Sequence, residues 1–68
     1  MEDEISKKIV SVIKSSDEPV ETKEIEQKIK GVSRDKILYR LFNLRGEGTI
    51  KGKQVGSGKG TWIWWKKT

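Results

Sequence analysis

SRDKILYRLFNLR, residues 33 to 45, is the segment from which the rest of this chain can be interpreted. Its apolar residues Ile37, Leu41 and Leu44 recur at i, i+4 and i+7, and Leu38 lies beside them. This is the spacing of a single apolar helix face. The segment therefore predicts an amphipathic helix whose apolar side packs on a core.

The other side of this predicted helix is polar and basic. Four residues recur there at i, i+3, i+4 and i+7, namely Lys36, Tyr39, Arg40 and Asn43. Phe42 lies at the boundary, about 100° from the centre of the apolar stripe at 3.6 residues per turn, and is expected to be half buried. An exposed helix face normally carries such residues, but the same face also has the chemistry to contact a nucleic acid.

The residues before this segment predict two more helices. The first is expected from about residue 3 to 15, on four apolar residues at helical spacing. These are Ile5, Ile9, Val12 and Ile13. Pro19 cannot continue a helix, and Val20 and Glu21 are expected to form a short extended piece.

The second helix is expected over 23–30, with Thr22 as its N-cap. Its apolar edge is narrow and consists of Ile25 and Ile29. Gly31 follows in the position where a left-handed C-cap conformation is needed. A surface helix, a short turn that contains glycine, and an amphipathic helix that starts at a serine cap, Ser33, form the pattern of a helix-turn-helix.

The last part of the chain predicts an antiparallel β-hairpin. Gly46, Glu47 and Gly48 are expected to stop the helix over 33–45. Residues 49–55 and 61–65 then have strand character, and the glycine-rich residues 56–60 form the turn between them. Gly52 weakens the first strand and indicates a bulge there.

Three tryptophans follow one another closely in the second strand. Strand alternation places Trp62 and Trp64 on one face and Ile63 and Trp65 on the other. One face must close the core beneath the first helix, and the alternation does not say which. A tryptophan left exposed is suited to stack on a nucleic acid, and we take Trp62 as the candidate.

Composition excludes several classes of function. Sixty-eight residues make one domain with a small core. The absence of Cys and His excludes disulfides, thiolate–imidazole zinc sites and nucleophilic devices that need either residue. We expect no enzymatic activity, no metal and no cofactor. The acidic N-terminus and the lack of an apolar run of about 20 residues predict no membrane span and a cytoplasmic location. The composition, rich in Lys, Glu and Ile, fits a thermophile.

The net charge of +5 is unevenly distributed. Residues 1–31 carry six basic and eight acidic residues, a net charge of −2. Residues 32–68 carry nine basic and two acidic residues, a net charge of +7. Lysine keeps small proteins soluble in general, but this segregation favours a surface that binds a polyanion.

A helix with this polar face fits the major groove of duplex DNA. There Arg can bond guanine, and Asn can bond adenine, through two hydrogen bonds each. We expect Arg40 and Asn43 to read bases and Lys36 and Tyr39 to contact phosphates or sugars. Arg34, near the helix N-terminus, can reach a phosphate with help from the helix dipole.

Over essentially its whole length the chain resembles the winged helix-turn-helix family. The resemblance is carried by PVETKEI (19–25), VSR (32–34), ILYRL (37–41) and LRGEGTI (44–50). It implies an α+β fold of three helices and a C-terminal hairpin, the wing, with an extended piece near Val20 that could add a third strand. In that family the third helix is the usual recognition helix and the wing commonly touches the backbone or the minor groove. Some winged helices instead make protein contacts.

A narrower resemblance is to the winged helices that bind left-handed Z-form nucleic acid. It is carried by Leu41, Leu44, Gly48 and Ile50 and by a tryptophan in the wing. The Asn and Tyr of their helix align with Leu38 and Phe42 here, and their paired wing prolines have no equivalent. Only Arg34 and a wing tryptophan match, so Z-form recognition is not expected.

These observations predict a single winged-helix domain over residues 1–68 that binds duplex DNA, as a transcriptional regulator or chromatin-associated protein. The alternative is a winged helix that docks a protein partner, or a second copy, in a larger nucleic-acid-processing assembly. Neither a membrane nor a small-molecule substrate is expected, and the choice between DNA and RNA stays open. The candidate binding residues are Arg34, Lys36, Tyr39, Arg40, Asn43, Lys51, Lys53, Lys59 and Trp62.

Overall fold

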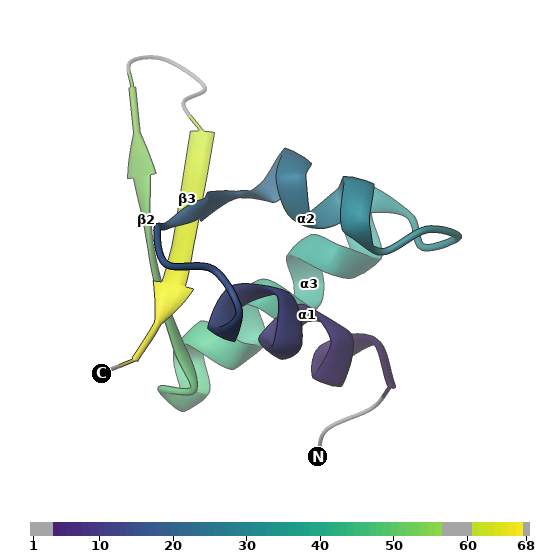
Figure 1. The fold of residues 1–68 in the computed structure, drawn as a ribbon, viewed down its shortest axis with the longest axis horizontal. Coiled ribbons are helices and arrows are strands. Elements are labelled where there is room, and N and C mark those ends of the chain that lie inside the picture. Colours follow the sequence, from purple (N-terminus) through teal and green to yellow (C-terminus); the bar gives the residue numbers. More distant parts are fainter. Residues whose placement is uncertain (1–3, 57–60, 68) are drawn as a thin grey trace.

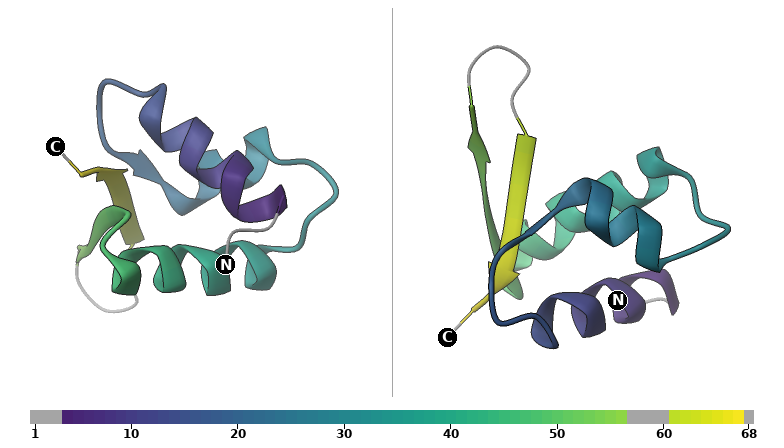
Figure 2. Two further views of the ribbon diagram at one scale, coloured as in Figure 1. Left: turned by 90° about the horizontal axis from the view of Figure 1, so that it is seen from below. Right: turned by 45° about the horizontal axis from the view of Figure 1, so that its top comes forward.

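A computed structural model describes residues 4–56 and 61–67. The chain forms a small α+β domain in which three helices lie on one side of a three-stranded antiparallel sheet (Figures 1 and 2). The elements in chain order are α1 (Glu4–Lys14), β1 (Val20–Glu21), α2 (Thr22–Lys28), α3 (Arg34–Glu47), β2 (Ile50–Val55) and β3 (Thr61–Lys66). The α+β class and the three helices are as predicted.

The sheet has the strand order β1-β3-β2. The short extended piece at Val20 and Glu21 does become a third strand, because Val20 pairs with Trp64 and Glu21 with Ile63. The strand β3 is thus central, and the helices cover one of its faces while the other face stays open (Figures 1 and 2).

The core confirms the apolar periodicities of the sequence. All three helices and all three strands contribute to one cluster of buried side chains. Its members are Ile9, Ile13, Val20, Ile25, Ile29, Ile37, Leu41, Leu44, Ile50 and Trp64. Phe42 has 43% of its surface exposed, so it is half buried as expected. The tryptophan face that closes the core is the one with Trp62 and Trp64.

The prediction for Thr22 is wrong. The N-cap of α2 is Glu21, whose backbone N–H donates to the carboxylate of Glu24 at 3.1 Å. Thr22 is the first helical residue and is buried, and its Oγ1 accepts a 2.8 Å hydrogen bond from Nε1 of Trp64. A buried indole N–H needs an acceptor, so the hydroxyl serves the tryptophan and not the helix end.

The prediction of a bulge at Gly52 is also wrong. The register of β2 and β3 runs without interruption from Ile50 opposite Lys66 to Val55 opposite Thr61. Gly52 lies opposite Trp64, and a Cβ atom at Gly52 would stand 2.3 Å from Cε3 of that ring. Glycine is needed here because the buried indole rests directly against the backbone.

The helix ends differ slightly from the prediction. The helix α2 ends at Lys28, two residues early, because Ile29 already has an extended conformation. Gly31 adopts the expected left-handed conformation at φ +81°, but it lies beyond the end of α2, whose C-cap is Ile29. The helix α3 passes through Gly46 and ends at Glu47, with Gly48 as a left-handed cap. Ser33 is its N-cap as predicted, since its side chain accepts from the Lys36 N–H at 3.4 Å.

In the described ranges no helix combines the length and apolar character that a bilayer crossing requires.

Candidate nucleic-acid interface

The uncovered side of α3 carries three of the predicted residues. Lys36, Tyr39 and Asn43 are all exposed, and Tyr39 has 67% of its surface in contact with solvent. Their spacing of three and four residues puts them along one side of the helix. The structure therefore brings together a cation, a phenol and an amide on an exposed side of α3.

Arg40 lies away from the hairpin side of the helix. It comes two residues before Phe42, so the two side chains point about 160° apart around the axis at 3.6 residues per turn. Phe42 faces the hairpin, where it contacts Trp62 and Trp64. Arg40 is partly buried, and its Nη1 donates to the Lys36 carbonyl at 3.4 Å. This bond holds one end of the guanidinium against its own helix.

Arg34 stands at the start of α3 and faces α2. Its Nε lies 3.8 Å from Oε2 of Glu26, and the arginine side chain is 63% exposed. Exposed pairs of this kind contribute about 0 to 1 kcal/mol. The guanidinium is thus lightly held and remains accessible to a phosphate.

Trp62 belongs to an aromatic cluster between α3 and the hairpin. Its ring stacks on Trp64 at 5.2 Å between centroids, and Phe42 meets it edge-on at 5.1 Å. The guanidinium carbon of Arg45 lies 5.3 Å from the Trp62 centroid, while Nε of Arg45 donates to the Gly52 carbonyl at 3.1 Å. Trp62 is therefore largely engaged in holding the hairpin against α3, and only part of its ring is open to a ligand.

A groove of about 320 Å³ runs between α2, α3 and β3. Leu38, Phe42 and Trp62 give it apolar walls, and the cations Lys23 and Arg34 lie among its lining residues. Lys23 and Leu38 were not among the candidate residues from sequence. Leu38 lay beside the apolar stripe of its helix, but Lys23 is 11 residues away from α3 in the chain, and only the packing of α2 brings it near.

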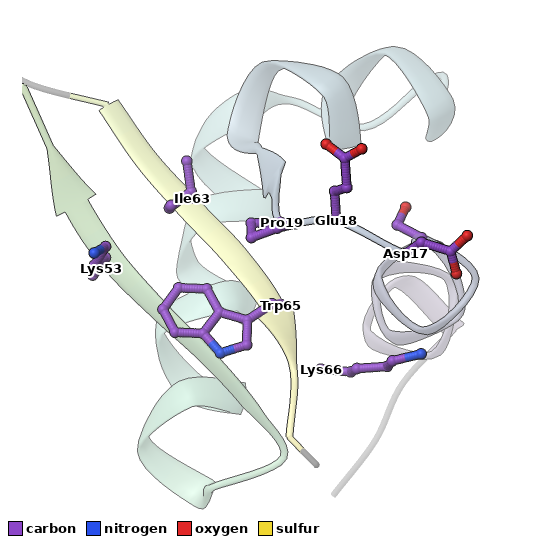
Figure 3. Close-up of a pocket in the computed structure, with 8 residues that line it drawn as sticks. Asp17, Glu18, Pro19, Lys53, Ile63, Trp65 and Lys66 are labelled. Atoms are coloured by element: carbon purple, nitrogen blue, oxygen red, sulfur yellow. The ribbon is translucent and has the colours of Figure 1, made fainter.

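The hairpin lysines lie on the opposite face of the sheet from Trp62. In the register of β2 and β3, Lys51 stands opposite Trp65 and Lys53 opposite Ile63. Figure 3 shows Lys53, Ile63 and Trp65 together on this open face. Lys59 lies outside the described residues. The candidate residues thus divide between two surfaces, the exposed side of α3 and the open face of the sheet.

Comparison of the chain with protein-family models, with curated proteins and with solved structures found no match. Within residues 4–56 and 61–67, no three His, Cys, Asp or Glu side chains gather as a metal site would require. What the protein binds is therefore inferred from the chemistry of the two surfaces.

Proposed function

We propose that this chain is a winged-helix domain that binds duplex DNA, with α3 in the major groove and the hairpin beside the backbone. The observation that carries this proposal is the uncovered side of α3, where Lys36, Tyr39 and Asn43 lie in a row. The major groove is about 12 Å wide and admits one α-helix. A helix of 14 residues with one bare polar side suits that groove.

The arrangement around α3 supports the same proposal. The hairpin is fixed against the helix through Phe42 and Trp62, so the two can meet one duplex as a single surface. Arg34 and Lys23 border the groove between them and can contact phosphates. Phosphate contacts position a protein on DNA, and Asn43 supplies a side chain that can read a base edge.

The salt dependence of binding tests the proposal. We expect a labelled duplex of mixed sequence to be bound in an anisotropy titration, with log K falling linearly as log salt rises, at a slope of about −0.9 for each phosphate contacted. Lys36→Ala should make that slope shallower by about 0.9. Lys7→Ala, which removes the same charge from the exposed side of α1, is the matched control and should leave it unchanged. Undetectable or salt-independent binding would overturn duplex recognition.

The exposed aromatic residues of α3 favour a second candidate, a protein-docking winged helix. Tyr39 and Phe42 are the large hydrophobic residues that stand exposed in the described part of the chain. Aromatic residues are enriched in protein interfaces. An NMR titration with a mixed-sequence duplex separates the candidates, because shifts that cluster at residues 34–43 and 51–61 support DNA and an unperturbed α3 supports a protein partner.

A further inference from the structure

The open face of the sheet is centred on Trp65. This residue is partly exposed and lines two separate hollows, of about 380 and 490 Å³. Figure 3 shows its indole ring broadside, beside β3 and next to Lys53 of the neighbouring strand. The aromatic cluster of Phe42, Trp62 and Trp64 lies on the other face of the sheet. Trp65 is thus not needed for that cluster, and one side of its ring can receive a ligand.

Several cations lie near this ring, some on β2 and some on residues outside that strand. Lys51 lies directly opposite Trp65, and Lys53 lies opposite Ile63, two residues along the strand. Arg45 and Lys67 line the larger hollow together with Lys51, and among the described residues every charged group in that lining is basic. The surface therefore offers several positive charges on one side of a flat aromatic ring.

Two of these cations lie near the C-terminal end of α3, and contacts within the fold hold one of them, Arg45, in place. Arg45 is fixed by its bond to the Gly52 carbonyl and by the Trp62 ring. The Nζ atom of Lys67 lies near Gly48, 3.9 Å from where a Cβ of that glycine would stand, and so near the C-terminal end of α3. The partial negative charge of a helix C-terminus favours a cation there. Arg45 is thus positioned before any ligand arrives, and Lys67 lies close to it at the end of α3.

The acidic groups of this face lie on its other side. Asp17 and Glu18 follow α1 and line the smaller hollow across from Trp65, where Lys53 and Lys66 also contribute (Figure 3). The two carboxylates and two lysines of this hollow balance in charge, whereas the charged residues of the larger hollow are all basic, so a polyanion is attracted towards β2. The charge distribution thus gives a bound chain a direction, with its phosphates along β2 and its uncharged groups over Trp65 and Ile63.

We propose that this face binds single-stranded nucleic acid, with a base stacked on Trp65 and phosphates held by Arg45, Lys51, Lys53 and Lys67. Proteins that bind single strands combine a basic track for the backbone with aromatic rings for the bases. A duplex is a poor ligand because its bases are already stacked on one another and do not present their faces. This second site does not depend on duplex binding by α3.

The test compares two oligomers of equal charge. One is a labelled thymidine decamer, and the other is a decamer of the same length in which abasic residues replace every base. We expect the thymidine decamer to bind at least about tenfold more tightly, since only it can stack. Trp65→Ala should weaken its binding about 5- to 150-fold, the loss of one base–aromatic stack, and Trp65→Phe should retain most of it.

Controls separate this site from the rest of the molecule. Tyr39→Ala removes an exposed aromatic residue from α3 and should leave thymidine binding unchanged, whatever it does to a duplex. Lys51→Glu and Lys53→Glu change exposed side chains, so the fold persists even where Trp65→Ala fails to fold, and each should weaken the decamer several-fold.

Three results would overturn the proposal. Equal binding of the thymidine and abasic decamers would show that no base stacks on Trp65. Unchanged affinity in both lysine variants would show that the decamer does not bind at the open face of the sheet. Displacement of the thymidine decamer by a glutamate decapeptide at comparable concentration would identify the face as a site for an acidic protein segment. Failure of duplex binding, in contrast, would leave the single-strand result standing.

Discussion

Trp64 is the residue at which the hairpin meets the helices. It is fully buried, its Nε1 donates to Thr22 at the start of α2, and its ring rests on Gly52 of β2. The Trp64 side chain therefore explains why a hydroxyl is needed at Thr22 and why no side chain fits at Gly52. Each of these two contacts can be tested by a substitution that changes the side-chain volume little but removes what the indole requires.

Thr22→Val should destabilise the domain by about 1 to 3 kcal/mol, because it leaves the buried Trp64 N–H without an acceptor while preserving the shape of the side chain. A domain of this size has about 3 to 10 kcal/mol in total, so the effect is large. Thermal unfolding followed by circular dichroism measures it, with a shift of about 4 to 8 °C per kcal/mol. Thr22→Ser keeps the hydroxyl and should lose much less; equal losses in both variants would contradict the role of the hydrogen bond.

Gly52→Ala should also destabilise the domain, by about 1 to 3 kcal/mol or more, because the added methyl group overlaps the Trp64 ring. Chemical denaturation measures the loss. Gly46→Ala is the matched control, since a Cβ at Gly46 meets nothing within 4 Å and alanine favours a helix interior. A Gly52→Ala variant as stable as the wild type would show that the indole can move aside.

At the scale of the element, α3 has three sides with separate tasks. Ile37, Leu41 and Leu44 are buried, Phe42 holds the hairpin, and Lys36, Tyr39 and Asn43 face solvent. Arg40 sits on the flank away from Phe42 with its guanidinium bonded back to the helix. The two residues expected to read bases thus start from different positions.

Asn43→Ala should weaken binding of a preferred duplex by about 1 to 3 kcal/mol and relax the choice of base at one position, if the amide reads an adenine. Arg40→Ala should do the same at a neighbouring position. Binding selections with a randomised duplex report both effects. Equal weakening across all sequences would show that neither residue reads a base.

In the molecule as a whole, the two candidate binding surfaces are the exposed side of α3 and the open face of the sheet, and the sheet lies between them. One face carries the tryptophans that lock the hairpin to α3, and the other carries Lys51, Lys53 and Trp65. A single cluster of buried residues from all six elements lies between the helices and the sheet. Neither surface can therefore form without the other.

This shared core predicts one cooperative unfolding transition. Far-ultraviolet circular dichroism, which follows the helices, and tryptophan fluorescence, which follows the hairpin, should give the same midpoint and slope in urea. The helices and hairpin share Trp64, so neither retains its packing alone. A fluorescence transition at lower urea than the circular dichroism transition would show a hairpin that detaches independently.

Local patterns in the amino-acid sequence are enough to predict the helices, the hairpin and most of the core. The spacing of Ile9 and Ile13, or of Ile37, Leu41 and Leu44, is a local property that assigns each residue to a face without knowledge of its neighbours in space. Ser33 as a cap and Gly31 in a left-handed conformation follow equally from local chemistry. The strand alternation that pairs Trp62 with Trp64 is local as well.

The partners of these faces, in contrast, depend on contacts between residues that are far apart in the chain. Thr22 looked like a cap because its partner, Trp64, is 42 residues away, and Gly52 looked like a bulge because the ring that rests on it belongs to another strand. In the sequence, the lysines of β2 and the basic residues of α3 belong to the same basic half of the chain, residues 32–68. The register of β2 and β3 places these lysines on the face of the sheet that the helices do not cover. A strand directs alternate side chains to opposite faces, and the packing of the helices decides which face is covered.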